Sequence, residues 1–471
     1  MDTPSNSKSK RLPAALTVSV GRLMSAAKCS LKETLHMHNP GPLAPVLNWV
    51  NPRFGPITRF RGMRLERPEP PWWLYQGDLV RTIGKFFTTD TPNALGCSLD
   101  PNEAMLRALG EAVERYTGYN SLHSAEVRQI RAADSELLKL FPFCLPDESC
   151  SDSFKGLGIG YTDDTLLTHT PAKRLKDGNA GSTYWIPAGA VHLSFWAKAP
   201  EPLIALPTSA GLSFYSNQVQ AIWSGLLELA ERDQMMIFWL NKVSIPKLRI
   251  EKESVGRELW QRISLIEKSG TKVNLFSMTR EFPIPAVFCI LESERFPYYV
   301  AGASAHEDAE VACTGAIDEA MAIRFAQHKF GSDAVVQSFA EFDWVKSFSD
   351  HANLYANWPN SPALDFLLKD NQNEISLQDY KHRDWLQAPN SMEDLANVAR
   401  RLEEIGLTVM WSDLTSTEAS DLGVCVKVTV PEMVPLIVAH KVRWLACPRL
   451  RNDNPSQRSA KDFNHDAHPF P

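Results

Sequence analysis

The chain has 471 residues, of which 44% are hydrophobic, so it can bury a large core and hold two or three domains. Its net charge is −6 and no Lys/Arg-rich stripe appears, which argues against nucleic acid as a partner. No apolar run approaches the roughly 18 residues that a membrane span needs, so no membrane partner is expected. The basic N-terminus lacks a clear signal-peptide cleavage site, and we interpret it as a cytoplasmic N-terminal extension.

The first ordered segment, 45–65, is predicted to form a strand, a turn at 51–55 and a second strand. The first long helix follows after Asp100, an N-cap residue, with Pro101 at the first helical position and Glu103 completing a capping box. A second helix is predicted to begin after Asn217, because Asn217 and Gln220, three residues later, form another capping-box pattern.

Beyond these helices the pattern alternates. We expect a helix at 255–269, strands at 272–277 and 285–291, and a strand, a small-residue turn and a third long helix within 297–327. After a variable stretch, a helix at 392–405 precedes strands at 407–412 and 423–430. The turn–helix unit thus occurs three times, near residues 100, 217 and 308, which favours an internally duplicated α/β domain over a solenoid.

A Glu-x-x-Glu-Arg pattern occurs in the first and second of these helices. Residues three and four apart share a helix face, so each copy places two carboxylates and a guanidinium together. Two such helices facing each other would assemble four carboxylates, which suits a hard divalent cation. The alternative is a solvated face carrying ordinary Glu–Arg ion pairs. The copies are Glu111, Glu114 and Arg115, and Glu228, Glu231 and Arg232.

The order of the three units resembles the YcaO superfamily. The matching segments are GCSLDPNEAMLRALGEAVERY, TSAGLSFYSNQVQAIWSGLLELAERD and GASAHEDAEVACTGAIDEAMAIR, followed by WSDLT (411–415), VKVTVPEM (426–433) and CPRL (447–450). The resemblance implies a mixed α/β (α+β) fold, in which long helices pack on largely antiparallel sheets and an ATP site lies between the Glu-bearing helices. We expect an N-terminal extension at 1–44, a YcaO domain at 45–450 and a flexible, proline-ended tail at 451–471.

The resemblance also implies the cofactors ATP and Mg²⁺ and the residues that hold them. The four glutamates Glu111, Glu114, Glu228 and Glu231 match the metal-side carboxylates. Arg115, Ser224, Arg232, Glu319 and Arg324 match positions that bind the nucleotide.

Several positions depart from the family pattern. Gly96, Cys97 and Ser98 stand where relatives often carry Gly-Lys-Gly, and Arg107 takes a position that is often serine. Gly315 and Ala322 stand where Arg and Gln are frequent. The details of phosphate and base binding are therefore open, and Arg107 is a candidate to replace one of the missing contacts.

The last residues refine the subclass. Azoline-forming cyclodehydratases of this superfamily commonly end in Pro-x-Pro-x-Pro, and this chain ends in Ala467, His468, Pro469, Phe470 and Pro471. Two of the three prolines match, so the resemblance gives Pro469 and Pro471 a catalytic role. Prolines restrict the free chain in advance, which lowers the entropic cost of ordering such a tail near the active site.

The expected activity is ATP-dependent cyclodehydration, which converts Cys, Ser or Thr of a ribosomally made precursor peptide to thiazoline or oxazoline. Two alternatives stay open: another backbone modification of the same superfamily, such as thioamide or amidine formation, and a non-catalytic nucleotide-binding scaffold. Because roughly 45 residues precede the first family-like segment, too few to fold readily alone, we expect a separate leader-peptide-binding partner. That partner would be ubiquitin-activating-like or winged-helix, a flavin-dependent dehydrogenase is a further candidate partner, and the chain itself would form a homodimer within the complex.

Overall fold

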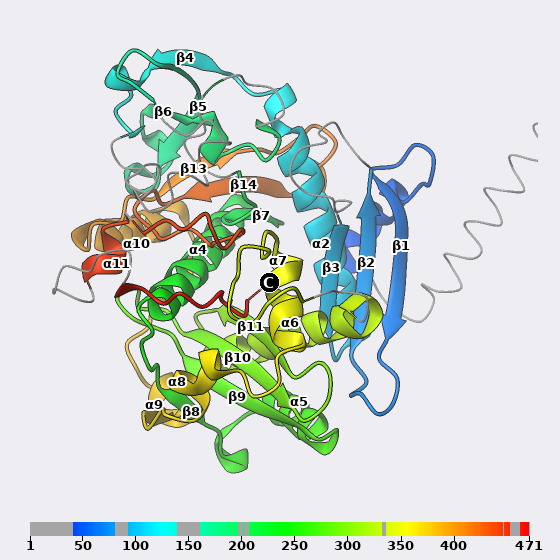
Figure 1. Ribbon diagram of the computed structural model, residues 1–471. Helices are drawn as coiled ribbons and strands as arrows, with labels where there is room; N and C mark the ends of the chain where they lie inside the picture. The colour runs from blue at the N-terminus through cyan, green and yellow to red at the C-terminus, as the bar shows by residue number, and fades with distance from the viewer. Residues whose placement is uncertain are drawn as a thin grey trace, which may run out of the picture.

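The computed structural model describes residues 41–80, 93–138, 161–195, 201, 207–331, 336–445, 447–452 and 462–470. Three long helices organise these residues, and each directly follows a short strand (Figure 1). An acidic or amide side chain caps each helix by accepting hydrogen bonds from the first-turn amides, as the sequence predicted for Asp100 and Asn217. The three units are β3 (Asn93–Ser98) with α2 (Pro101–Asn120), β7 (Leu212–Tyr215) with α4 (Gln218–Leu240), and β11 (Tyr299–Ala305) with α6 (Ala309–Phe330).

Within the described part of the chain the strands form three sheets, and all pairs of named strands but one are antiparallel, as predicted. A three-stranded sheet has the order β1-β2-β3, with β1 Ile57–Arg64 and β2 Trp73–Leu79. A five-stranded sheet has the order β11-β10-β9-β8-β12, in which β8 and β12 are parallel. Its other strands are β8 Lys247–Arg249, β9 Thr271–Ser277, β10 Ala286–Ser293 and β12 Glu374–Ser376. The third sheet has the order β4-β5-β13-β14-β7, with β6 paired to β5. Its other strands are β4 Arg128–Arg131, β5 Leu166–Arg174, β6 Thr183–Pro187, β13 Met410–Asp413 and β14 Val424–Thr429.

Shorter helices cover the sheets and connect the strands. The α-helices are α5 Arg257–Lys268, α7 Phe348–Ala356, α8 Asp365–Leu368, α9 Leu377–Lys381, α10 Met392–Glu404 and α11 Arg449–Asn452. The 3₁₀ segments are η1 Gly41–Trp49, η2 Ser121–His123, η3 Ala132–Asp134, η7 Leu175–Ala180, η8 Ala188–Ala190, η10 Lys252–Ser254 and η12 Pro362–Leu364. No helix among the described residues is long and apolar enough to cross a membrane.

The mixed fold of long helices on largely antiparallel sheets is confirmed, whereas internal duplication stays a prediction. One local expectation is wrong: the strand predicted after residue 45 is the 3₁₀ segment η1. Pro45 lies inside η1, and proline has no amide hydrogen to give to a strand ladder. The capping-box role expected for Glu103 also differs from the structure. Its carboxylate accepts a hydrogen bond from Ser98 Oγ and pairs with Arg107.

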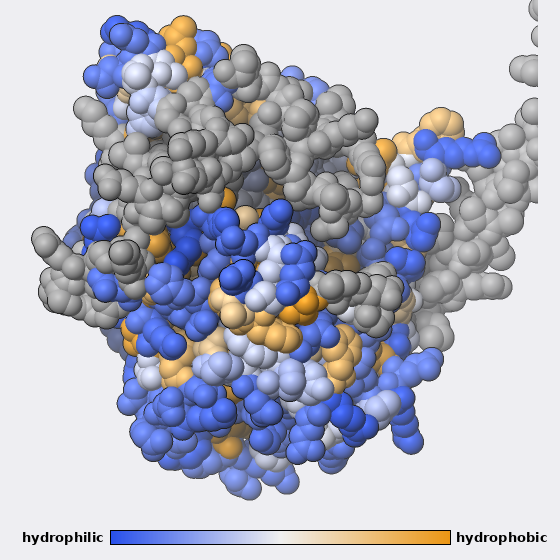
Figure 2. Space-filling view, viewed as in Figure 1, coloured by the Kyte–Doolittle hydropathy of each residue, from blue (hydrophilic) through white to orange (hydrophobic). Residues whose placement is uncertain are grey.

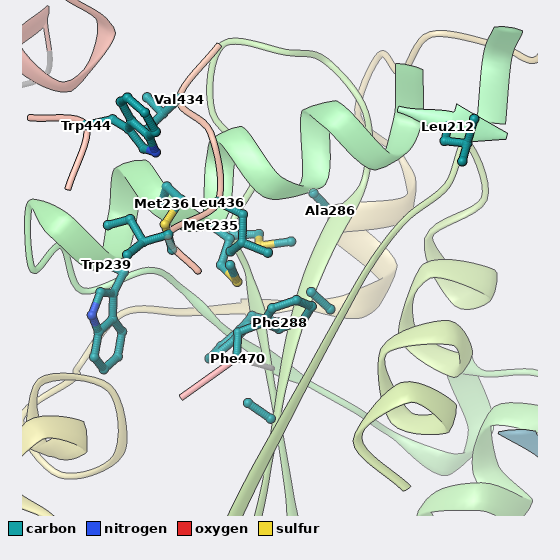
Figure 3. Close-up of a cluster of buried hydrophobic side chains, with 14 of the residues drawn as sticks. Leu212, Met235, Met236, Trp239, Ala286, Phe288, Val434, Leu436, Trp444 and Phe470 are labelled. Carbon is teal, nitrogen blue, oxygen red and sulfur yellow. The ribbon is translucent and has the colours of Figure 1, made fainter. Parts of the chain in front are cut away.

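The expectation of a flexible tail is wrong for residues 462–470, which pack into the interior. Phe463, Ala467 and Phe470 are at most 1% exposed, and Phe470 lies in the same apolar cluster as Phe288 and Met235 (Figure 3). In Figure 1 this segment crosses the molecule below α4 and approaches α7. Its apolar side chains explain the packing, because burying each contributes roughly 1.5–3 kcal/mol.

Most large apolar side chains are interior, and Figure 2 shows that hydrophilic residues cover most of the visible described surface. A buried ion pair helps to hold the end of the chain. The Arg449 guanidinium, from the CPRL segment, donates to both Asp233 carboxylate oxygens at 2.7 and 3.2 Å, and Asp233 is fully buried on α4. The residue after Arg232 thus anchors α11 to the second long helix.

Candidate functional site

One glutamate on each long helix accepts a hydrogen bond from a backbone amide in, or directly before, the strand that precedes its helix. In each unit a carboxylate oxygen accepts a hydrogen bond from a backbone N–H 16 or 17 residues earlier. The pairs are Leu95 N–Glu111 Oε2 at 2.8 Å, Gly211 N–Glu228 Oε2 at 3.0 Å and Ala303 N–Glu319 Oε2 at 2.6 Å. The same strand–helix geometry therefore delivers three carboxylates.

Two arginines lie among these carboxylates. Arg115 Nη2 is 3.1 Å from Glu111 Oε1, and its Nε is 3.8 Å from Glu114 Oε1. Arg232 Nη1 is 2.8 Å from Glu231 Oε1, and its Nη2 lies 3.7 Å from Glu228 Oε1 and 3.8 Å from Glu319 Oε1. The second arginine thus joins α4 to α6, and the i,i+4 pairs expected on an isolated helix are part of an interhelical cluster.

Burial and repulsion from neighbouring carboxylates raise the pKa of Glu114 and Glu231 and make these two side chains hard to ionise. Burial raises the pKa of Glu114 well above its usual value, with Arg115 opposing this and Glu228 and Glu111 adding to it. Burial likewise raises the pKa of Glu231 to about 8, with Glu319 and Glu228 adding repulsion. Several carboxylates forced together in this way favour binding of a cation.

The donor types suit magnesium and phosphate together. Carboxylate oxygens are the hard ligands that Mg²⁺ takes, and guanidinium groups bind phosphate oxygens in a bidentate fashion. Within the described ranges, however, no group of three or more His, Cys, Asp or Glu side chains is arranged to hold a metal ion. In this structure the carboxylates are turned instead toward Arg115, Arg232 and the strand amides.

Lys427 belongs to the same site, although the sequence did not single it out. It lies on β14, is 4% exposed, and its Nζ donates to the carbonyls of Thr208 and Ala210, both at 2.6 Å. Burial lowers its pKa to about 8, while Glu228 and Glu114 act to raise it. One signal in the sequence could have indicated Lys427. It is the single lysine of an otherwise apolar strand, within the family-like segment VKVTVPEM.

The remaining predicted nucleotide-binding residues lie in different surroundings. Ser224 is half-buried on α4, one turn before Glu228. Arg324 makes its contacts elsewhere: its Nε and Nη2 donate to the Glu69 carboxylate at 2.5 and 2.8 Å, and its Nη1 donates to the Pro297 carbonyl. Burial acts to raise the pKa of Glu69, but hydrogen bonds from His328 and Arg324 bring it down to about 2.

The C-terminal segment reaches the cluster through Phe470. The Arg232 Cζ lies 4.4 Å from the centroid of the Phe470 ring, a cation–π contact that sequence reasoning missed. Pro469 is buried, and Pro471 lies outside the described residues. The sequence assigned the role of the C-terminal segment to Pro469 and Pro471. In the structure the residue that contacts Arg232 is Phe470, which lies between them.

The departures from the family pattern also have structural settings. Arg107 donates to the Cys97 carbonyl at 2.8 Å and to the buried Asp318 at 3.1 Å, so its guanidinium is already engaged. A Cβ added at Gly315 would stand 2.4 Å from Ser304 Oγ, so a larger side chain there requires the Ser304 side chain to move. Ala322 is half-buried on α6.

The fold and this acidic, arginine-bearing site define the class of protein. Residues 95–434, more than half of the chain, match the family model described as "YcaO cyclodehydratase, ATP-ad Mg2+-binding". The chain therefore belongs to the YcaO family, whose cofactors are ATP and Mg²⁺. An uncharacterized protein of Methanothermobacter thermautotrophicus is 27% identical over 257 residues, which cover 52% of this chain and 61% of that relative.

Solved structures share the fold. A heterocyclase in complex with substrate and cofactor aligns with a TM-score of 0.71 at 18% identity, covering 91% of this chain and 57% of the heterocyclase. YcaO from Methanopyrus kandleri, bound with AMPPCP and Mg²⁺, aligns with a TM-score of 0.59 at 18% identity, covering 84% and 91%. The E. coli microcin synthetase McbBCD complex gives 0.51 at 16% identity, covering 82% and 90%. This chain thus spans little more than half of the heterocyclase and of the curated relative.

Proposed function

We propose that the chain is an ATP-dependent cyclodehydratase that forms thiazoline or oxazoline rings from Cys, Ser or Thr of a precursor peptide. The observation that carries the proposal is the cluster of Glu111, Glu114, Glu228, Glu231 and Glu319 around Arg115 and Arg232. Like charges held together at this density favour a bound cation, and the arginines supply phosphate ligands beside it.

The proposed reaction closes a ring in the peptide backbone. The side-chain thiol or hydroxyl attacks the carbonyl carbon of the preceding amide, and the former carbonyl oxygen leaves as part of phosphate. ATP supplies the γ-phosphoryl group that makes this oxygen a leaving group, and Mg²⁺ neutralises the phosphate charge. The protein's task is mainly to position these groups and to stabilise negative charge.

We assign the two Glu-x-x-Glu pairs to the metal side and the two arginines to the phosphates. For this role Arg115 and Arg232 would exchange their carboxylate partners for phosphate oxygens while the metal takes the carboxylates. Ser224 and Glu319 lie near enough along their helices to contribute to the nucleotide side. We leave Arg324 out of the phosphate set because Glu69 and Pro297 already take its donors.

We propose that the C-terminal segment completes the site. Phe470 lies on Arg232, and Pro469 precedes it in a buried position. Removal of residues 469–471 would lower the rate of ring formation even at saturating ATP. A truncated protein that cyclises peptide at the full rate would exclude this role.

A partner is part of the proposal. The McbBCD structure is a synthetase complex, and one of its forms contains pro-MccB17. By analogy, a separate ubiquitin-activating-like or winged-helix protein would present the precursor peptide to this chain, and a flavin-dependent dehydrogenase would oxidise azolines. Co-purification with proteins from neighbouring genes tests this arrangement, and full activity of the polypeptide alone would contradict it.

The test of the activity is direct. The protein, its co-purified partners, precursor peptide and Mg-ATP are incubated, and the peptide is analysed by mass spectrometry for losses of water at Cys, Ser or Thr. Absence of these losses with an active partner would overturn the proposal. Exchange of oxygen for sulfur would instead indicate thioamide formation.

A non-catalytic scaffold is the second candidate. Gly315 in place of the frequent arginine favours it, as do the backbone hydrogen bonds that already occupy Glu111, Glu228 and Glu319. Hydrolysis of ATP by the purified complex at a rate that falls in Glu228→Gln would exclude it.

A further inference from the structure

Of the three glutamates that accept a backbone amide ahead of their helix, Glu228 is held differently. Leu95 lies within β3 and Ala303 within β11, so the sheet ladders fix the amides that bind Glu111 and Glu319. Gly211 comes one residue before β7 begins, in the turn 208–211. The amide that binds Glu228 therefore depends on whatever holds this turn.

Lys427 holds the turn from the neighbouring strand. Its Nζ donates to two carbonyls of the turn, Thr208 and Ala210, at 2.6 Å each. The next residue, Val428, donates its backbone N–H to the Gly211 carbonyl at 2.7 Å. Two side-chain hydrogen bonds from Lys427 and one backbone hydrogen bond from Val428 thus connect β14 to the turn.

The turn leaves little freedom for the Gly211 amide. Gly211 has φ of +79°, and a Cβ on it would stand 2.4 Å from the Val428 carbonyl oxygen. Only glycine fits this conformation and this close approach. Its N–H is thereby directed at Glu228 Oε2, 3.0 Å away.

We propose that Lys427 is a positioning residue that sets the Glu228 carboxylate for Mg²⁺ through the turn 208–211, an inference that rests on the proposed function. An ammonium group has three donors and no acceptor, so it can satisfy two carbonyls and still present positive charge to the carboxylates. The Lys427 side chain is the buried cation on β14, between the Glu-bearing helices α2 and α4, and both Glu114 and Glu228 attract it.

The test compares Mg²⁺ binding with stability in the full chain. Lys427→Met removes the positive charge and both hydrogen bonds to the turn while keeping an apolar chain of similar length. Groups that orient a metal ligand without touching the metal typically affect affinity 10–100-fold. We expect Mg²⁺, titrated calorimetrically in the presence of a non-hydrolysable ATP analogue, to bind at least about tenfold more weakly. The melting temperature of the metal-free protein should change far less than a global loss of packing would require.

Controls separate this role from a general structural one. Lys173→Met removes a lysine from the same sheet, where it lies 5.4 Å from the Trp411 ring, and should leave Mg²⁺ affinity unchanged. Lys427→Gln keeps amide donors for the carbonyls, and we expect it to retain part of the affinity. If Lys427→Met folds poorly, the Mg²⁺ affinity of Lys427→Gln is the measurement that tests the proposal.

The outcomes are distinct. Wild-type Mg²⁺ affinity in both Lys427 variants would overturn the positioning role while leaving the proposed function intact. Failure of the wild-type protein to bind Mg²⁺ with the nucleotide analogue would overturn the proposed function itself, and the positioning role with it.

Discussion

The guanidinium of Arg232 lies against the ring of Phe470, with Cζ 4.4 Å from the ring centroid. The same guanidinium is 2.8 Å from Glu231 and 3.8 Å from Glu319. One face of Arg232 is thus covered by an aromatic ring while its edge meets carboxylates of two helices. The ring restricts where the guanidinium can move when its carboxylate partners change.

Replacing Phe470 with alanine should loosen Arg232. A desolvated cation–π contact is worth about 2 kcal/mol, and the lost ring also leaves a cavity. We expect a higher KM for ATP, on the order of tenfold, and a lower melting temperature. Phe470→Leu is the matched control: it restores apolar volume without a π face, so stability should largely return while the KM stays high. Equal KM values in Phe470→Leu and the wild type would show that the ring only fills space.

Replacing Glu231 with glutamine should separate function from stability. Burial raises the pKa of Glu231 to about 8, so its ionised form is unfavourable in the metal-free protein. The neutral amide should therefore leave the metal-free melting temperature equal or higher, while ATP hydrolysis that depends on Mg²⁺ is lost. Glu126→Gln, at an exposed glutamate, should alter neither property. A large loss of stability in Glu231→Gln would assign the carboxylate a structural role.

The packed tail should respond to acid through two stacked histidines. The rings of His351 and His468 lie 3.8 Å apart and nearly parallel, and both are buried. Burial lowers the pKa of His351 to about 3 and that of His468 well below its usual 6.5. The unfolded chain therefore binds more protons between about pH 6.5 and 3, so stability is present above pH 6.5 and is lost as the pH falls below it.

The loss should reach roughly 1–2 kcal/mol per histidine near pH 5. Thermal unfolding at pH 7.5 and pH 5 measures it, and hydrogen exchange should show residues 463–470 losing protection first. In the double variant His351→Phe/His468→Phe this part of the pH dependence should disappear. An unchanged slope in that variant would assign the acid sensitivity to His192 and His440, whose pKa values burial also lowers.

Breaking the Asp233–Arg449 pair should destabilise the protein strongly. Asp233 is fully buried, and Arg449→Met would leave its carboxylate without its bidentate partner. Removal of one member of a buried pair typically costs about 3–5 kcal/mol. Denaturant unfolding of Arg449→Met, Asp233→Leu and the double variant forms a cycle, and we expect the double variant to recover much of the loss. Additive losses would show that the two side chains act independently.

The long helices and the glutamates of the cluster were predictable because their signals are local. Asp100 and Asn217 cap their helices as expected, and the Glu-x-x-Glu-Arg spacing alone places each carboxylate pair beside an arginine. The spacing could not predict that the third long helix contributes a carboxylate to this cluster. Glu319 lies close to Arg232 only because β11 and α6 fold against α4.

Long-range packing also explains why the sequence did not predict the positions of the tail, Lys427 and Arg324. The polar composition of the segment after residue 450 predicted flexibility, but Phe463, Ala467 and Phe470 fill an apolar cluster formed by distant parts of the chain. Lys427 was overlooked for the same reason, since its carbonyl partners lie more than 200 residues earlier. Arg324 fitted a family position, yet Glu69 from the loop between β1 and β2 binds it.

The hydrogen bonds from backbone amides to Glu111, Glu228 and Glu319 make the site more sensitive to chain length than to residue identity. Each added residue turns a helix by about 100°, so one insertion between Leu95 and Glu111 would carry the carboxylate away from its amide. Substitutions along the same 16 residues would leave that register intact. The three intervals should therefore tolerate many replacements but no insertions or deletions, and a library of single-residue insertions scored for Mg²⁺ binding would map the site without changing any of its side chains.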